Sequence, residues 1–148
     1  MAAEPLIRTA TADDLPALRD VFRRAALSNE GDREWIEAHQ DEWGLDESNV
    51  IEGRTRVALV GGVIVGFSTL VGSELEDLFV DPDRMRQGIA TALVRDVGAT
   101  VPRIDLTANP HALAFYESVG FVEDGIVPTS GGPAYRMHLD CEAPTARR

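Results

Sequence analysis

Two adjacent glycines, Gly61 and Gly62, stand between two short runs rich in β-branched and apolar residues. Val57–Val60 precedes them and Val63–Phe67 follows them. Glycine adopts positive φ without a steric penalty, so a Gly-Gly pair suits the two-residue turn that joins antiparallel strands. A third run, Leu75–Val80, follows after a few residues. This part of the chain is therefore predicted to form a three-stranded antiparallel meander.

Helical patterns lie on both sides of the meander. After Thr11, apolar residues recur at steps of three and four, as on one face of a helix: Leu15, Leu18, Val21, Phe22 and Ala25. Thr11 is predicted to cap this helix, with Asp14 in a capping-box arrangement. Asn109 and Pro110 suit the start of a later helix and Gly120 its end. Further helices are expected at 34–43 and 88–100, and strands at 6–8, 104–106, 121–122 and 134–139. Such alternation predicts a mixed α/β domain.

Length and composition limit the classes of protein that this chain can belong to. The sequence has 148 residues, 44% of them hydrophobic, which suits one folded domain, expected over residues 1–141 with a flexible tail at 142–148. A net charge of −11 repels phosphate backbones, so no nucleic-acid partner is expected. The single cysteine, Cys141, cannot form an internal disulfide. Without a leader pattern or an apolar run of roughly 18 residues, a cytoplasmic protein with no membrane partner is expected.

The segment from Leu78 to Leu93 has the pattern of a strand, a turn, a glycine and a helix. Pro82 ends the strand because proline cannot donate to a strand ladder, and Gly88 permits close approach of the backbone. The first amides of a helix have no partner inside it and lie at the positive end of the helix dipole. They suit a phosphate or diphosphate group. An ordinary helix start after a glycine turn explains this segment equally well, and neither a Walker loop nor a GxGxxG motif is present.

Two motifs together resemble those of the GNAT superfamily of N-acetyltransferases. The first, similar to its acyl-CoA-binding motif, is Val80-Asp81-Pro82…Arg86-Gln87-Gly88-Ile89-Ala90…Leu93. The second, similar to its Asn…Ala…Phe-Tyr…Gly-Phe segment, runs from Leu106 to Phe121. The resemblance implies a mostly antiparallel central sheet with helices on both faces. It also implies an enzyme that moves an acetyl group from acetyl-CoA directly to a primary amine in a ternary complex.

The resemblance also implies roles for individual residues. The backbone of β-strand residues Leu78, Phe79 and Val80 would hold the pantetheine arm, as an added strand does. The diphosphate would be held by amides of the following loop and helix, with Met85, Arg86, Gln87, Gly88, Ile89, Ala90 and Thr91 as the expected binding residues. Met85 stands where the family often has Gln or Arg, and Arg84 or Arg86 could supply the charge instead. Tyr116 would bind the donor and protonate its leaving sulfur, and Asn109 would contact the donor, cap a helix, or do both. Without the motif, Tyr116 reads as a core aromatic residue.

The general base is predicted among the acidic residues of the third meander strand. Glu74 and Glu76 share one face of this strand, because side chains alternate, and Glu74 stands where some family members carry a base glutamate. A solvated charge at a strand edge is the alternative for both residues. The acceptor is expected to be a small-molecule amine or a protein amine. The net negative charge of the chain would attract such an amine in its cationic form.

Other functions remain open at this point. The same groove could serve a catalytically silent acyl-CoA sensor, or a transferase for oxygen acceptors or longer acyl chains. His39 with Trp35 and Trp43 could line an acceptor pocket, although packing explains the tryptophans as well. The histidines lack metal-ligand spacing, so no metal is expected. Homodimers are frequent in similar proteins, but no interface is visible in the sequence.

Overall fold

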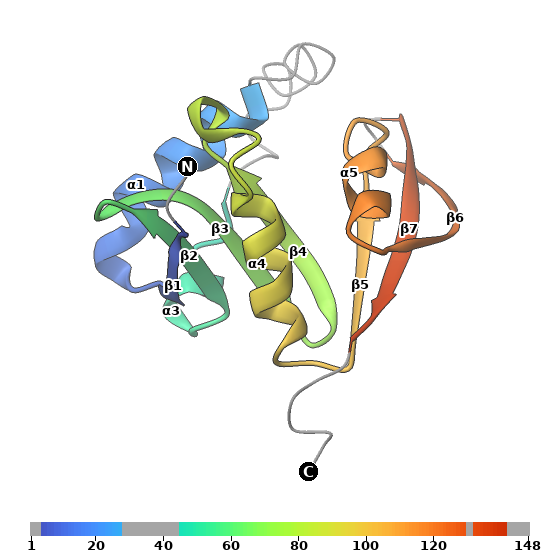
Figure 1. Cartoon of the computed structure of the whole chain (residues 1–148), viewed down its shortest axis with the longest axis horizontal. Helices are drawn as coiled ribbons and strands as arrows, with labels where there is room; N and C mark the ends of the chain where they lie inside the picture. Colours follow the sequence, from blue (N-terminus) through green and yellow to red (C-terminus); the bar gives the residue numbers. More distant parts are fainter. Residues whose placement is uncertain (1–3, 28–44, 130–131, 142–148) are drawn as a thin grey trace. The chain divides into compact units, whose positions relative to one another are not determined.

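The computed structural model describes residues 4–27, 45–129 and 132–141. The described strands form one seven-stranded sheet in the order β1-β2-β3-β4-β5-β7-β6. Pairing is antiparallel between β1 and β2, β2 and β3, β5 and β7, and β6 and β7, whereas β4 and β5 pair in parallel. The elements alternate along the chain as Figure 1 shows. The predicted mixed, mostly antiparallel α/β fold is therefore confirmed.

The chain divides into two compact units. The first comprises Met1–Thr69 and Asp77–Leu93, and the second comprises Leu70–Glu76 and Val94–Arg148. Strands β3 and β4 and helix α4 each contribute residues to both units.

The first unit contains the predicted meander and the first amphipathic helix. Its elements are β1 (Leu6–Thr9), η1 (Ala12–Asp14), α1 (Leu15–Leu27), α3 (Ser48–Ile51), β2 (Thr55–Val60), most of β3 (Val63–Val71), the end of β4 (Glu74–Val80), η3 (Pro82–Arg84) and the start of α4 (Ile89–Gly98). Gly61 and Gly62 have φ of 60° and 80° and join β2 to β3, as predicted. The Thr11 amide donates to Asp14 Oδ2 at 2.8 Å, which confirms the capping interaction, although the short η1 precedes the helix.

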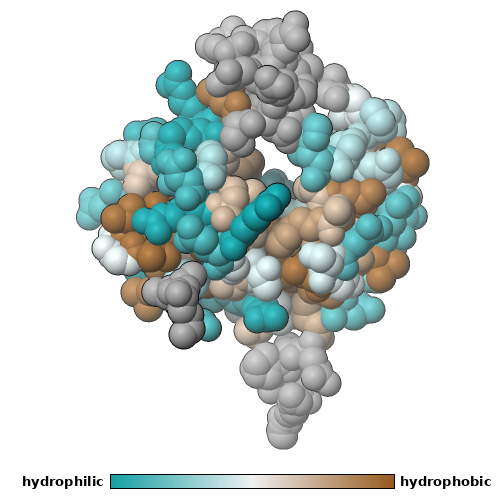
Figure 2. Space-filling view, turned by 45° about the horizontal axis from the view of Figure 1, so that its top comes forward, coloured by the Kyte–Doolittle hydropathy of each residue, from teal (hydrophilic) through white to brown (hydrophobic). Residues whose placement is uncertain are grey.

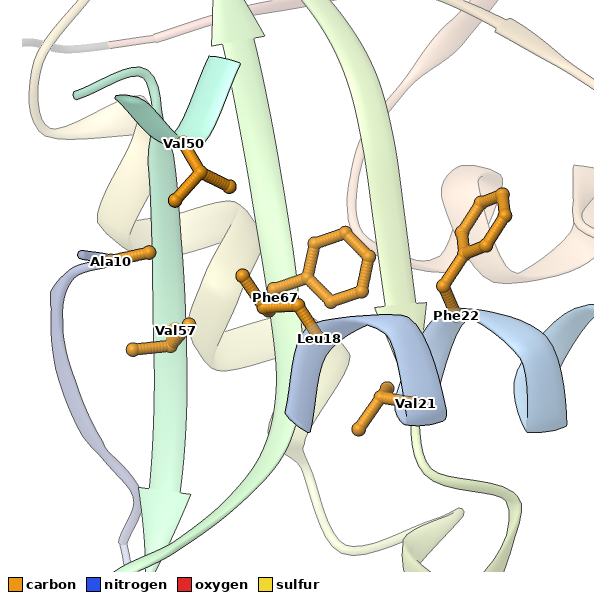
Figure 3. Close-up of a cluster of buried hydrophobic side chains, with 7 residues drawn as sticks. All are labelled: Ala10, Leu18, Val21, Phe22, Val50, Val57 and Phe67. Atoms are coloured by element: carbon orange, nitrogen blue, oxygen red, sulfur yellow. The ribbon is translucent and has the colours of Figure 1, made fainter. Parts of the chain in front are cut away.

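Helices cover both faces of the meander because side chains alternate along its strands. Leu18, Val21 and Phe22 of α1 pack against Val57 and Phe67, and Figure 3 shows these side chains with Ala10 and Val50. The next residue along β2, Ala58, points to the opposite face and joins a cluster with Val65, Ile89 and Leu93, the last two from α4. The expected placement of helices on both faces is thus confirmed within this unit.

The second unit carries the remaining strands and the short helix α5. It contains β5 (Arg103–Ala108), α5 (Leu113–Ser118), β6 (Val122–Thr129), β7 (Gly132–Asp140) and the second half of α4. Ile104, Leu106 and Met137 are fully buried in it. The predicted helix start at Pro110 is wrong, since α5 begins at Leu113. The Ala112 amide bonds to both the backbone and side-chain oxygens of Asn109, which forms a turn before the regular helical bonding starts.

The surface view in Figure 2 shows many hydrophilic side chains with smaller hydrophobic patches between them. Within the described ranges, every helix falls short of the length and hydrophobicity required to cross a membrane. The second predicted helix (34–43), with Trp35, His39 and Trp43, and the tail 142–148 lie outside the described residues.

Candidate functional site

The loop between β4 and α4 places a set of backbone amides at the surface. Gly88 has φ of 81°, and Arg86 has φ of 64°, a left-handed conformation that is uncommon for a residue with a side chain. A Cβ built on Gly88 has nothing within 4 Å, and Gly88 is exposed. The first α-helical bond at this end runs from the Ala92 amide to the Gly88 carbonyl at 2.9 Å. The amides from Arg86 to Thr91 therefore precede the bonded ladder of α4 and are available to an anion.

A close approach at Gly66 holds this end of α4 against the sheet. A Cβ at Gly66 would lie 2.9 Å from the Phe79 carbonyl oxygen and 3.1 Å from Ile89 Cγ2. Ile89 and Leu93 are buried, with exposed fractions of 2% and 0%. Only glycine leaves room for the helix here, so Gly66 sets the position of the first turn of α4.

The predicted donor-binding residues divide into packed and exposed groups. Leu78 and Val80 pack on the α4 side of the sheet, and Phe79 packs on the α1 side with its ring 4.8 Å from that of Phe22. Their side chains are thus used in packing, so a ligand at these residues would meet their backbone. By contrast, the loop residues Met85, Arg86, Gln87 and Gly88 are exposed, and Ala90 and Thr91 are half-buried.

A buried carboxylate begins this loop, and sequence reasoning did not identify its partner. Asp81 accepts two hydrogen bonds from the Arg24 guanidinium of α1, at 2.8 and 2.7 Å. The hydrogen bonds from Arg24 lower the pKa of Asp81. The two residues are 57 positions apart, and a single arginine on an amphipathic helix carries no local signal of such a pair.

Tyr116 lies in the second unit, two residues before the end of helix α5. The Phe121 amide donates to the Tyr116 carbonyl at 3.0 Å and the Gly120 amide donates to the Glu117 carbonyl at 3.1 Å, which together form a Schellman turn. The turn brings the Phe121 ring edge-on to the Tyr116 ring, with Phe115 on another side. Burial raises the pKa of the Tyr116 phenol to about 12. The phenol is therefore protonated at neutral pH and can act as a proton donor.

The two glutamates predicted as bases have different surroundings. Glu74 is half-buried and receives two hydrogen bonds from Arg136, at 2.7 and 3.1 Å. Arg136 also donates to Thr107 Oγ1 at 2.9 Å. Glu76 is exposed on the same strand. Arg136 on β7 was missed by sequence reasoning, because β4 and β7 are distant in the chain and only the sheet order brings them together.

The remaining candidate residues belong to the second unit. The Asn109 side chain accepts from the Ala112 amide at 3.0 Å, so its role in shaping the turn is present. His138 pairs with Asp124 at 2.8 Å, and burial raises the pKa of the Cys141 thiol. Among the described residues, no three His, Cys, Asp or Glu side chains are grouped as a metal site requires.

The sequence is similar to those of known acetyltransferases. The family profile "Acetyltransferase (GNAT) domain" matches residues 51–123. The chain is 36% identical over 64 residues to the peptidyl-lysine N-acetyltransferase YjaB of Salmonella typhimurium, covering 41% of this chain and 44% of that protein. The chain spans about half the length of the curated relatives it matches.

Solved structures resemble this chain over nearly its whole length. The apo form of YjaB from Escherichia coli superposes with a TM-score of 0.73 at 23% identity, covering 93% of this chain and 98% of that chain. N-acetylglutamate synthase from Neisseria gonorrhoeae, solved with coenzyme A and N-acetylglutamate, superposes with a TM-score of 0.67 at 16% identity, covering 96% of this chain and 36% of that one. These likenesses establish the fold. Together with the profile match over residues 51–123, they show that the chain is similar in sequence and in fold to the GNAT acetyltransferases.

Proposed function

We propose that this protein transfers an acetyl group from acetyl-CoA to an amine, with both substrates bound at the same time. The observation that carries the proposal is the loop from Arg86 to Gly88 with the first turn of α4. Its amides precede the helical ladder, and the space around Gly88 is open. Such a group of amides at the positive end of a helix suits the diphosphate of coenzyme A.

Backbone groups, more than side chains, would bind the acetyl-CoA donor. Amides from Arg86 to Thr91 would bind the diphosphate, and an exposed Met85 does not prevent this because the contact is made by the main chain. The backbone of Leu78, Phe79 and Val80 would bind the pantetheine arm, since their side chains are already packed. The coenzyme A in the N-acetylglutamate synthase structure supports a donor of this class for the fold.

The reaction needs one proton removed and one delivered. The amine nitrogen attacks the thioester carbonyl carbon, the carbon–sulfur bond breaks, and the amine loses a proton as the amide forms. Tyr116 would give its proton to the departing thiolate, because the phenol carries that proton at neutral pH. Asn109 would contact the donor through its amide nitrogen, because its oxygen already accepts from Ala112.

A carboxylate on β4 would receive the proton from the amine. Glu74 is the better placed of the two, since Arg136 fixes both of its oxygens. Glu76, which is exposed, would act through water. The exposed Glu76 carboxylate also attracts the ammonium form of the acceptor before that group loses its proton.

The charge of the chain and the name of one similar protein support a cationic acceptor. A net charge of −11 favours cationic acceptors, such as a lysine side chain or a small amine. The similar Salmonella protein is named a peptidyl-lysine N-acetyltransferase. This name supports a lysine-bearing peptide as the first acceptor to assay.

Two measurements test the proposal. Titration calorimetry with coenzyme A should give saturable binding, and a thiol-release assay with acetyl-CoA and a panel of amines should give turnover. Tyr116→Phe should lower kcat by about a hundredfold while leaving coenzyme A affinity unchanged. Absence of coenzyme A binding would refute the proposal. Binding without turnover for any amine would instead identify a silent acyl-CoA sensor.

A further inference from the structure

The loop proposed to bind a diphosphate begins with two carboxylates. Asp81 is buried, with an exposed fraction of 8%, and Asp83 follows two residues later. Two negative charges at the start of an anion-binding loop would oppose the ligand unless a cation neutralises them. The cation that meets them is Arg24, which comes from α1.

One guanidinium serves both carboxylates. Arg24 holds Asp81 through two hydrogen bonds, at 2.8 and 2.7 Å, and lies 3.7 Å from Asp83 Oδ2. It also donates to Asp20 at 3.0 Å, four residues earlier on α1. The planar guanidinium matches a carboxylate in this two-bond geometry, which a lysine ammonium cannot reproduce.

Asp81 in turn shapes the loop. Its amide donates to the Val65 carbonyl at 2.8 Å, which ties the loop to β3. Its Oδ1 accepts from the Asp83 amide at 2.9 Å, and its carbonyl accepts from the Arg84 amide at 2.8 Å. The carboxylate that Arg24 grips is therefore the one that sets the turn leading to Arg86 and Gly88.

We propose that Arg24 is a positioning residue for the donor, which neutralises Asp81 and fixes the loop that binds the diphosphate. This inference rests on the proposed function. It assigns to α1, a helix outside both matched motifs, a specific part in recognising the diphosphate half of acetyl-CoA. Its effect is confined to donors that carry a diphosphate.

The test compares two acyl donors and three arginine variants. S-acetylpantetheine carries the same thioester as acetyl-CoA but no diphosphate. Arg24→Met removes the cation, and Arg24→Lys keeps the charge without the paired geometry. Arg19→Met is the matched control, because Arg19 lies on the same helix and holds Glu47 through two similar bonds, at 2.6 and 2.8 Å.

Arg24→Met should weaken coenzyme A binding by about tenfold or more, since it leaves a buried carboxylate unpaired. The ratio of kcat/KM for acetyl-CoA to that for S-acetylpantetheine should fall by a similar factor. Arg24→Lys should have a coenzyme A affinity and a kcat/KM ratio between those of wild type and Arg24→Met. Arg19→Met should leave the ratio unchanged. Adding Asp81→Asn to Arg24→Met should restore part of the affinity, because the unpaired charge is then gone.

A merely structural role would lower kcat/KM for both donors equally, and that result would overturn the inference. Unchanged coenzyme A affinity in Arg24→Met, or an equal loss of the ratio in Arg19→Met, would overturn it as well. If wild type itself bound no coenzyme A, the proposed function would fail first. The two failures are thus distinguishable.

Discussion

The ring of Tyr116 stands edge-on to the ring of Phe121, with 5.3 Å between the ring centroids. The chain reverses between them at Gly120, which has φ of 108°, and the Schellman turn locks this reversal. Phe121 is buried, with an exposed fraction of 3%, so it anchors the end of α5 to the core of the second unit. The orientation of the proposed proton donor is therefore fixed by residues that follow its helix.

Gly120→Ala should disturb Tyr116 more than the donor-binding loop. A Cβ at Gly120 would lie 3.1 Å from Leu139 Cδ1, and the positive φ is unfavourable for alanine. We expect a loss of about 1–3 kcal/mol in the free energy of unfolding. Below the melting temperature, kcat should fall while coenzyme A affinity is kept. Gly53→Ala is the control, because φ there is 80° and nothing lies within 4 Å; an equal loss of kcat in that variant would contradict the expectation.

The Tyr116 phenol should ionise only in strongly alkaline solution. Burial raises its pKa to about 12, above the ordinary value of 10.0. A raised folded-state pKa means that the neutral phenol stabilises the fold below pH 10, and that this contribution is lost as the pH rises through 12. The difference in tyrosinate absorbance between wild type and Tyr116→Phe should titrate near pH 12. A midpoint near 10 would show that the phenol is solvated.

Glu74→Gln should reduce kcat more than Glu76→Gln. Arg136 orients both oxygens of Glu74, whereas Glu76 is exposed. A general base typically contributes about a hundredfold or more to turnover. We expect a loss of that order in Glu74→Gln, a small change in Glu76→Gln, and no change in coenzyme A affinity in either. The reverse order in steady-state assays would assign the base to Glu76.

Gly66→Ala should weaken both the fold and donor binding. The added methyl would meet the Phe79 carbonyl and Ile89, neither of which can move without shifting β4 or α4. Overpacking of this kind costs about 1–3 kcal/mol, which denaturant unfolding can measure. Coenzyme A affinity should fall too, because the first turn of α4 moves. If stability fell while coenzyme A affinity stayed unchanged, the packing of α4 against Gly66 would not control donor binding, and the prediction would be wrong.

The contribution of Asp14 to the free energy of unfolding should be lost at acid pH. Its hydrogen bonds from Arg8, at 2.8 and 3.0 Å, lower its pKa from 3.8 to about 2. A lowered folded-state pKa means that the contribution is complete above about pH 4 and is lost as the pH falls through 2. Asp14→Asn should therefore cost about 2 kcal/mol at pH 6 and little at pH 2. A cost independent of pH would show that the ion pair is not responsible.

Local chemistry allowed much of the fold to be predicted. The Gly61-Gly62 turn, the amphipathic face of α1, the start of α4 after Gly88 and the end of α5 at Gly120 follow from the steric freedom of glycine and from helical periodicity. The start of α5 was placed too early, because an Asn-Pro pair also suits a turn. The resemblance to the GNAT family and the mostly antiparallel sheet are confirmed, whereas the roles of individual site residues remain predictions.

The order of residues by itself determined which segments become strands, turns and helices, and where an anion-binding loop could form, because those properties depend on neighbours within a few positions. Tertiary structure alone decided that Arg24 meets Asp81, that Arg136 meets Glu74, and that α4 lies against Gly66. These pairs join segments that are distant in the chain. Their partners are set by how sheet and helices pack, which short-range sequence patterns do not encode.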